Sequence, residues 1–492
     1  MITISRRLAL KMRAVVRRAL GTRRLGPAVC FTVAAGTLSV KAKSADIAVE
    51  HRLPTDAADE TLWLPFEFLD DCSGKRDEPV RVESTGKGRV MAEWRDGSVP
   101  QIVQYDSAVP ADADKFPTPP ETFTENPPGL LKALDDARDT TDPSPTRFAM
   151  DCVQWRGATG SLAASDGRHL LVQSGYQFPW QEDLLIPGSK VFGSPELPQD
   201  SPVRVGKSGN WVAIAVEPWT IYLAVNVDGR FPDVTRHIPS AAEAMACCSF
   251  SAADAGFLAE TLPRLPCDDD GNRAVTLDLN GHVAVRAKPS DSTRPTEVVL
   301  TGSSFTGEPI RVNTNRTYLA RAMRLSLREL SITGTETALA CSDESRQYVW
   351  MPLSPESAIS PAEDAIRIES PNAGVETPAT QPQTRRRVFP VTEPVSNSNG
   401  SAASNGNGQA NGHAKTNGQA KTNGEARKTS GRKAELQDTA ALIEQAEKLR
   451  TALHNLMHQA NGLVKSLKQH RRQSRAIQST LDSIRQLKGL GV

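Results

Sequence analysis

Two short motifs have residue types and spacings that could support nucleotide or cation chemistry. Gly206-Lys-Ser matches the last three residues of a phosphate-binding P-loop motif, but Ser201 occupies the position where that motif needs its first glycine. Asp268-Asp-Asp-Gly could begin a calcium loop, yet the later ligand positions are missing, which favours a plain acidic turn. No HExxH or GxSxG motif occurs either. The sequence therefore predicts that the protein is not an enzyme.

The thiols and imidazoles predict neither a disulfide framework nor a metal centre. Seven cysteines lie at positions 30, 72, 152, 247, 248, 267 and 341, an odd number without a CxxC pair. The eight histidines show no ligand spacing on one face. We expect reduced thiols in a cytosol, and neither a metal nor a cofactor.

Length and charge limit the class of protein. A chain of 492 residues is too long for one core, and the usual domain size of roughly 100 to 200 residues suggests three or four units. Lys+Arg of 58 against Asp+Glu of 57 leaves the net charge near zero, so any electrostatic function must be local. No apolar run approaches the roughly 18 residues of a membrane-spanning helix, so we expect no membrane partner.

The first residues allow two interpretations. An Arg-rich stretch from Arg6 to Arg24, followed by the apolar run from Pro27 to Ala35, superficially resembles a signal or transit peptide. The alternation that continues from Gly36 favours a helix followed by the strands of a folded domain.

From Leu62 to about Leu353, short β-like runs alternate with turn signals and helical stretches, which predicts an α+β protein. The clearest strand-like runs begin at Pro79, Trp211, Ile221, Ala274 and His282. The helical candidates are Arg6 to Leu20, Pro65 to Cys72, Pro128 to Arg138, Ser251 to Leu262 and Arg316 to Leu325.

The composition changes after about Ser360. The stretch from Ser396 to Gly424 is dominated by Asn, Gly, Ala, Lys and Gln, without large apolar residues, and predicts a disordered, flexible linker.

The last segment repeats apolar residues in alternating steps of four and three, the spacing of a coiled-coil seam. The seam consists of Leu442, Leu449, Leu453, Leu456, Leu463, Leu467, Ile477, Leu481 and Ile484. The alternative is a single amphipathic helix that packs on the body of the protein. A polar layer at His470 and Ser474 interrupts the seam, and the lysines and arginines around it form either a phosphate-contacting surface or a solvated face.

Three elements in the middle of the chain are informative when taken together. Arg147-Phe-Ala-Met-Asp-Cys-Val-Gln-Trp precedes Ser161-Leu-Ala-Ala-Ser-Asp-Gly-Arg-His-Leu, which by itself is two strands around a turn. Val227-Asp-Gly-Arg-Phe-Pro-Asp follows, and then Asn315-Arg-Thr-Tyr-Leu through Tyr348-Val-Trp-Met-Pro-Leu. They resemble, in order, the "A-T-D-G-H-R-L", "F-P-D-Y-R-R-x-x-P", "F-N-x-x-Y-L" and "Y-x-x-M-P-[ML]" elements of the bacterial DNA sliding clamps, the DNA polymerase III beta subunits.

The resemblance covers roughly residues 5 to 354 and implies a DNA clamp (processivity) fold. Such a fold has three similar domains, each with inner helices and outer antiparallel sheets. We expect clamp domains over 1–121, 122–240 and 241–355, a flexible linker over 356–433 and a coiled-coil helix over 434–490.

The resemblance also implies a homodimeric ring around double-stranded DNA. Binding would be independent of base sequence, so the inner helices need only modest positive charge. The DNA-binding residues expected on the first helix are Arg13, Arg17, Arg18, Arg23 and Arg24.

Clamps bind short peptides of DNA polymerase and other partners in a groove between the second and third domains. The matching positions here are Met150, Ser165, Gly167, Arg168, His169, Leu170, Pro232, Arg236, Asn315, Tyr318, Met351 and Pro352.

The sequence departs from the clamp pattern at several points. Arg168-His169 reverses the usual order, which changes the side chain that faces the groove. Pro195 and Pro198 stand where the second inner helix of the middle domain is expected, so that helix should be missing or very short. The preceding helix carries Asp135, Asp136 and Asp139, an acidic balance that would weaken contact with DNA.

Three functions remain open from the sequence. The first is a nucleoid-associated processivity clamp that tethers DNA polymerase. The second is a clamp-fold scaffold that no longer encircles DNA and acts through protein contacts and coiled-coil self-association. The third is a DNA-binding module that acts through its basic tail.

Overall fold

The computed structural model describes residues 1–21, 26–86, 88–107, 109–110, 115–146, 148–268 and 272–371. These residues all belong to one compact unit, Met1–Gln383. Arg23, Arg24 and the predicted coiled-coil seam lie outside the described residues.

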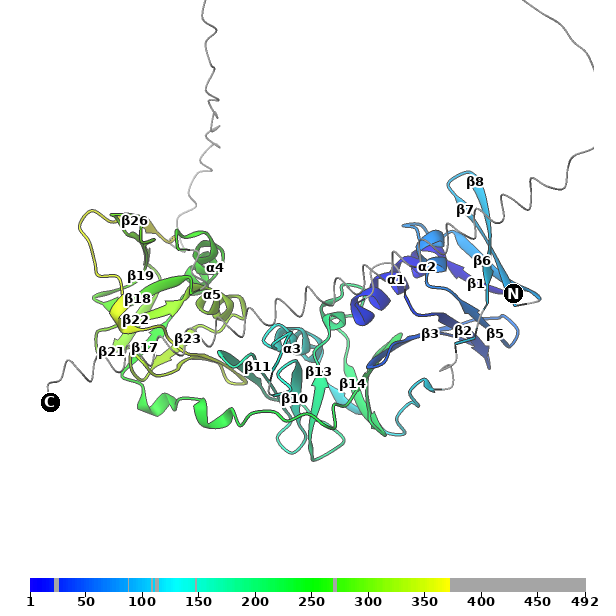
Figure 1. The fold of residues 1–492 in the computed structure, drawn as a ribbon, viewed down its shortest axis with the longest axis horizontal. Helices are drawn as coiled ribbons and strands as arrows, with labels where there is room; N and C mark the ends of the chain where they lie inside the picture. Colours follow the sequence, from blue (N-terminus) through cyan, green and yellow to red (C-terminus); the bar gives the residue numbers. More distant parts are fainter. Residues whose placement is uncertain are drawn as a thin grey trace, which may run out of the picture. The chain divides into compact units, whose positions relative to one another are not determined.

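The unit is built from six copies of a short β-α-β-β-β pattern, two in each of three domains (Figure 1). In domain 1 the first copy consists of β1 (Ile2–Ser5), α1 (Arg6–Leu20), β2 (Val29–Ala34), β3 (Thr37–Lys43) and β4 (Ile47–Pro54). The second consists of β5 (Glu60–Leu64), α2 (Glu67–Cys72), β6 (Pro79–Gly86), β7 (Arg89–Asp96) and β8 (Val99–Asp106).

Domain 2 repeats the pattern with one shortened helix. Its first copy consists of β9 (Thr124–Asn126), α3 (Gly129–Arg138), β10 (Cys152–Arg156), β11 (Ser161–Ser165) and β12 (His169–Gln173). Its second consists of β13 (Asp183–Pro187), the 3₁₀ helix η2 (Lys190–Gly193), β14 (Val203–Ser208), β15 (Trp211–Val216) and β16 (Trp219–Ala224). The short inner helix expected from Pro195 and Pro198 is therefore confirmed.

Domain 3 follows two short 3₁₀ turns, η3 (Thr235–His237) and η4 (Ala241–Glu243). Its first copy consists of β17 (Ala246–Ser249), α4 (Ala252–Thr261) with η5 (Leu262–Arg264), β18 (Ala274–Asn280), β19 (His282–Ala287) and β20 (Thr296–Leu300). After the extra strand β21 (Ser304–Gly307), the second consists of β22 (Ile310–Asn315), α5 (Arg316–Arg324), β23 (Glu329–Ile332), β24 (Leu339–Ser342) and β25 (Arg346–Trp350).

Two of the four sheets run from one domain into the next. The eight-stranded sheet has the order β5-β2-β3-β4-β16-β15-β14-β9, and the nine-stranded sheet β13-β10-β11-β12-β25-β24-β23-β17-β21. The other two are β1-β6-β7-β8 in domain 1 and β22-β18-β19-β20-β26 in domain 3. The domains are thus joined by antiparallel pairing of β4 with β16 and of β12 with β25.

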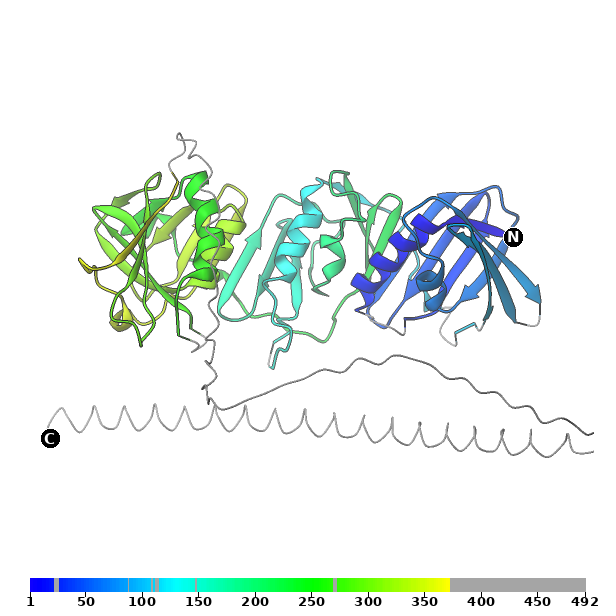
Figure 2. The same ribbon diagram turned by 90° about the horizontal axis from the view of Figure 1, so that it is seen from above.

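The helices lie across one side of the sheets within each domain (Figure 2). Helix α1 begins where the Ser5 hydroxyl accepts a hydrogen bond from the backbone N–H of Leu8, and ends at Gly21 with φ of 65°. Its apolar residues recur at helical spacing and are buried, with Met12 and Val15 at most 1% exposed. This buried stripe leaves Arg7, Arg13, Arg17 and Arg18 exposed or half-buried, whereas Arg6 at the start of the helix is buried.

The start of the predicted linker differs from the expectation. Residues 356–371 hold the end of η6 (Pro355–Ser357) and a strand, β26 (Ile366–Glu369), which pairs in parallel with β20. The reason is local, because Ile-Arg-Ile-Glu alternates in the manner of a strand and finds an open sheet edge.

Candidate partner groove and DNA-facing helices

The predicted groove residues gather where β12 pairs with β25. The pairing aligns His169 with Trp350, Leu170 with Val349 and Leu171 with Tyr348. Because side chains alternate along a strand, His169 and Leu171 lie on one face of the sheet and Leu170 on the other.

The helix-side face carries a buried polar and aromatic cluster. The ring of His169, a buried residue, stacks on Tyr318 with centroids 4.9 Å apart, and its Nδ1 lies 2.9 Å from the hydroxyl of Tyr348. Nε2 of His169 lies 3.3 Å from Oδ2 of Asp166. Burial raises the pKa of Tyr348 well above its ordinary value, so this hydroxyl stays protonated. The polar groups of this cluster bond to one another, and their contacts hold β12 and β25 together.

A tight turn precedes this cluster. Oδ1 of Asp166 accepts hydrogen bonds from the backbone N–H groups of Arg168, at 2.8 Å, and His169, at 3.0 Å. Gly167 has φ of 84°, which favours glycine, and the Ser165 hydroxyl accepts from its N–H. Burial alone would raise the pKa of Asp166, but these hydrogen bonds and His169 bring it below the ordinary value. The turn presents Arg168 to solvent and turns His169 inward.

The outer face of the same sheet carries a small apolar cluster, which we call the outer-face cluster. Its buried members are Leu170, Val234, Ala340 and Val349, and its half-buried members are Val172, Phe231, Ile238 and Ala338. These half-buried side chains form an apolar floor beside Met351, which is 52% exposed. Such a floor can take an apolar side chain of a peptide.

The remaining groove residues lie around these two clusters. Pro232 lines a shallow pocket with Gln154, Arg156 and Asp183, while Arg236 is exposed beside Asp233. Asn315 caps α5, its side chain accepting from the N–H of Thr317 at 2.8 Å. The Sδ and Cε atoms of Met150 flank Gly167, and the N–H of Met351, followed by Pro352, donates to the carbonyl of Arg168 at 3.3 Å. The predicted residues therefore do not form one surface: His169 and Tyr318 meet on the helix side of the sheet, and Leu170 lies on its outer face.

The arginines of α1 are engaged by α2. Nη2 of Arg17 lies 2.7 and 2.8 Å from the two carboxylate oxygens of Asp70, and Nη1 of Arg13 lies 3.6 Å from Oδ1 of Asp70. Arg18 donates to the carbonyl of Gly193 at the end of η2, at 2.8 Å. Asp70, which sequence reasoning missed, offsets part of the charge expected on α1.

Charge on the other described helices is uneven. In α3, Lys132 pairs with Asp136 and Arg138 with Asp139, while burial and then the charges of Asp139 and Asp136 raise the pKa of Asp135. Helix α5 contributes Arg321, which donates to the carbonyl of Asp136 at 2.6 Å and to the hydroxyl of Thr140 at 2.9 Å. Positive charge is thus concentrated on α1 and α5.

No protein-family model and no curated protein matches the sequence. Solved structures do match. The chain is similar to the sliding clamp of Pseudomonas aeruginosa, DNA polymerase III subunit beta, bound to griselimycin, with 17% identity and a TM-score of 0.59 over 72% of this chain and 99% of that one. It is similar to DNA polymerase III subunit beta of Borrelia burgdorferi, with 12% identity and a TM-score of 0.60 over 72% and 97%.

The chain has the DNA sliding-clamp fold. The sliding clamp of Bacillus subtilis gives the same result, with 17% identity and a TM-score of 0.58 over 72% of this chain and 98% of that one. Since nearly the whole length of each solved clamp is matched, all three clamp domains are present. The fold predicted from the motifs is confirmed.

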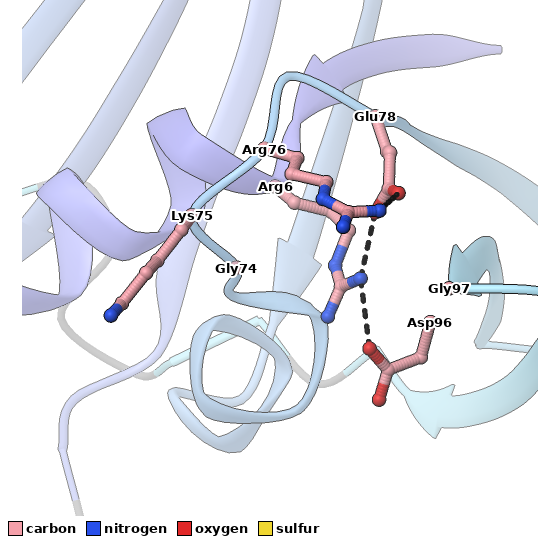
Figure 3. Close-up of a pocket in the computed structure, with 7 residues that line it drawn as sticks. All are labelled: Arg6, Gly74, Lys75, Arg76, Glu78, Asp96 and Gly97. Atoms are coloured by element: carbon pink, nitrogen blue, oxygen red, sulfur yellow. Dashed lines mark hydrogen bonds and ion pairs between the residues drawn. The ribbon is translucent and has the colours of Figure 1, made fainter.

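One pocket of this clamp fold lies away from every predicted site. It is lined by Arg6, Gly74, Lys75, Arg76, Glu78, Asp96 and Gly97 (Figure 3). Nη1 of Arg6 lies 2.8 Å from Glu78 and 3.0 Å from Asp96, and its Nε donates to the carbonyl of Cys72 at 3.2 Å. These contacts within domain 1 tie the start of α1 to the segments at Cys72, Glu78 and Asp96.

Two further properties concern only the described part of the clamp fold. Within it, no group of three or more His, Cys, Asp or Glu side chains is arranged to hold a metal ion. None of the helices found there is long and apolar enough to cross a membrane.

Proposed function

We propose that the chain is a divergent DNA polymerase III beta subunit, a non-enzymatic processivity factor that encircles double-stranded DNA and tethers DNA polymerase and other partners during replication. The observation that carries this proposal is the match to 97–99% of the length of solved sliding clamps. Two copies would close head to tail into a ring in the bacterial cytoplasm, associated with the nucleoid.

The charge of the helices supports contact with DNA. Helix α1 contains six basic residues and no acidic ones among Arg6–Leu20, of which all but Arg6 are at least partly exposed, and α5 adds Arg321 and Arg324. A ring needs contacts with phosphates only, because a topological link keeps it on DNA without base recognition. Asp70 and the carboxylates of α3 make this contact weak, which suits a ring that slides.

The outer-face cluster supports the tethering of partners. Leu170 and Val349 form a buried floor, and Phe231 and Ile238 leave apolar surface beside it. An extended peptide that inserts one or two apolar side chains there would be held by burial, with Arg168 and Arg236 at the polar rim.

Retention on circular DNA tests the ring. The full chain, incubated with nicked circular plasmid and a clamp loader, should co-elute with the plasmid in gel filtration and should be lost when a single cut linearises the plasmid. Equal retention on circles and linear DNA, or no retention on either, would contradict a topological link.

The helix charge gives a matched set of variants for the same assay. Arg17→Gln with Arg18→Gln should weaken retention and its dependence on salt. The slope of the logarithm of the binding constant against the logarithm of salt concentration should become shallower by about 0.9 for each phosphate that the ring no longer neutralises. Asp70→Asn, which frees Arg13 and Arg17, should increase retention. Arg204→Gln with Lys207→Gln in β14, which removes the same two positive charges from a strand, is the control and should change nothing.

A further inference from the structure

The two junctions inside the chain follow one rule. In each, the last strand of the first β-α-β-β-β copy of one domain pairs antiparallel with the last strand of the second copy of the next domain. The pairs are β4 with β16 and β12 with β25. The same rule predicts a third pairing, of β20 in domain 3 with β8 in domain 1. Because domain 3 is the last domain, this β8 would belong to domain 1 of a second copy of the chain.

The β8 edge is open in the way this rule requires. Strand β8 pairs with β7 on one side and with no other strand among the described residues. Two of its apolar side chains, Val99 and Ile102, are 55% and 65% exposed. An unpaired edge with exposed apolar residues is a template for another strand.

The β20 edge, in contrast, is occupied by the chain's own β26. The pairing is parallel, unlike both junctions, and aligns Val298 with Ile368. The N–H of Ile366 donates to the carbonyl of Pro295 and that of Ser370 to the carbonyl of Val299, each at 2.9 Å. These bonds use backbone acceptors along the edge of β20, at Val299 and at Pro295 just before the strand, that a partner strand would otherwise use.

The segment before β26 runs across the face of the same sheet. Nδ2 of Asn313 in β22 donates to the carbonyl of Ser354, and the N–H of Ile359 donates to the hydroxyl of Thr276 in β18. Nε of Arg294 then donates to the carbonyl of Asp364, immediately before β26. These contacts lead the chain from β22 to the β20 edge and define where β26 pairs.

β26 itself is held weakly. It is four residues long, Ile366 is 51% exposed, and the side chain of Arg367, which lies 3.2 Å from Glu297, is 66% exposed. A short strand that buries little apolar surface opens at low cost. The junction strands, by comparison, bury residues such as Ile221 and Leu171 completely or nearly so.

We propose that β26 is a removable cap on the ring-closing edge of β20, and that the β8 strand of a second copy binds there only after β26 leaves. This inference rests on the proposed homodimeric ring. Closure of the cap reduces the fraction of chains able to dimerise, and because both chains of the ring must open, the apparent dissociation constant rises by the square of that factor.

Opened and locked variants of the full chain test the cap. Ile366→Pro with Ser370→Pro removes both backbone donors and should lower the apparent dimer dissociation constant at least about tenfold, the factor that corresponds to ~1.4 kcal/mol. Glu363→Pro, outside β26, is the matched control and should behave as the wild type. Masses come from light scattering over a concentration series.

The locked variant joins β26 to β20 through Val298→Cys and Ile368→Cys, with the exposed Cys267 replaced by Ser. It should stay monomeric when oxidised and recover dimerisation on reduction. Ile102→Asp should abolish the dimer of the opened variant, because that dimer uses β8.

The outcomes separate the two proposals. If the oxidised locked protein dimerises as well as the reduced one, the cap is wrong and the ring stands. If no variant dimerises at any concentration, the homodimeric ring is wrong and the cap falls with it.

Discussion

The two junctions between domains use the same backbone pairing and differ in the side chains that surround it. Both consist of five antiparallel residue pairs. At the first junction, one apolar core runs from domain 1 into domain 2 without a break. At the second, the core of domain 3 takes only Leu171 from domain 2, and the separate outer-face cluster lies on the other side. The first junction also has a small separate cluster, Ala48, Ala213 and Tyr222, so the difference lies in the main core, which is continuous across the first junction and almost interrupted at the second. We call the first junction a fused core and the second a seam.

Contacts between helices strengthen both junctions in a similar way. Arg18 of α1 donates to the carbonyl of Gly193 across the first, and Arg321 of α5 donates to the carbonyl of Asp136 across the second. Because the helix contacts are similar at the two junctions, the junctions differ mainly in their apolar cores. The proposed peptide groove lies at the second junction, where the main core contributes less.

Truncation of one core residue at each junction should give the largest difference. Ile221→Ala removes a fully buried side chain of the fused core and should cost ~2 to 5 kcal/mol, destabilising domains 1 and 2 together. Leu170→Ala, in the small outer-face cluster, should cost about half as much, because its surroundings can relax into the groove. Urea unfolding followed by tryptophan fluorescence measures both. Equal costs would remove the distinction between a fused core and a seam.

A pH dependence should belong to the first junction. His51 of β4 is buried against Trp219, with ring centroids 4.4 Å apart, and its Nδ1 has no hydrogen-bond partner among the described residues. Burial, and then the charge of Lys11, lowers the pKa of His51 to about 4. In the unfolded chain His51 binds a proton at about pH 6.5, whereas in the folded chain it stays neutral until the pH approaches 4. The free energy of unfolding therefore falls as the pH drops from about 6.5 toward 4.

Comparison with His51→Phe isolates this contribution. Phe fills the same apolar site without a titrating group, so the wild type should lose on the order of 2 to 3 kcal/mol more than the variant between about pH 7 and pH 4.5. Glu50 does not interfere, although it lies in the same strand. Burial alone would raise the pKa of Glu50, but hydrogen bonds from Ser39 and Arg52 bring it below its ordinary value, so its contribution is lost only at lower pH. Parallel pH profiles for wild type and variant would contradict the assignment.

Local sequence signals predicted most of the elements but little of their contacts. The helix from Arg6 to Leu20 and the turn at Asp166-Gly167 are short-range features, and each is found where the sequence predicts it. The prolines at 195 and 198 likewise predicted the shortened η2. Such features depend on neighbours in the chain, which a sequence displays directly.

Contacts between residues far apart in the chain could not be predicted from the sequence. Asp70 meets Arg17 from 53 positions away, and β26 pairs with β20 across about 70 positions. Four residues such as Ile-Arg-Ile-Glu are too few for alternation to identify a strand. The division of the groove residues between two faces, in contrast, could have been predicted, because His169 and Leu170 are adjacent in one strand.

The smallest effect should be found at the seam, in peptide binding. Met351→Ala should weaken a fluorescein-labelled clamp-binding peptide about tenfold, or ~1.4 kcal/mol, in fluorescence anisotropy. The side chain of Met351 is 52% exposed while its backbone N–H donates to the carbonyl of Arg168, so truncation removes apolar surface without opening the sheet.

Ile102→Ala, an exposed apolar truncation on β8, is the control and should leave peptide affinity unchanged. Tyr318→Ala is a less clean variant because Tyr318 also stacks on the buried His169. If Met351→Ala and Ile102→Ala bind the peptide equally well, the apolar floor is not the recognition surface, and the second junction differs from the first only in stability.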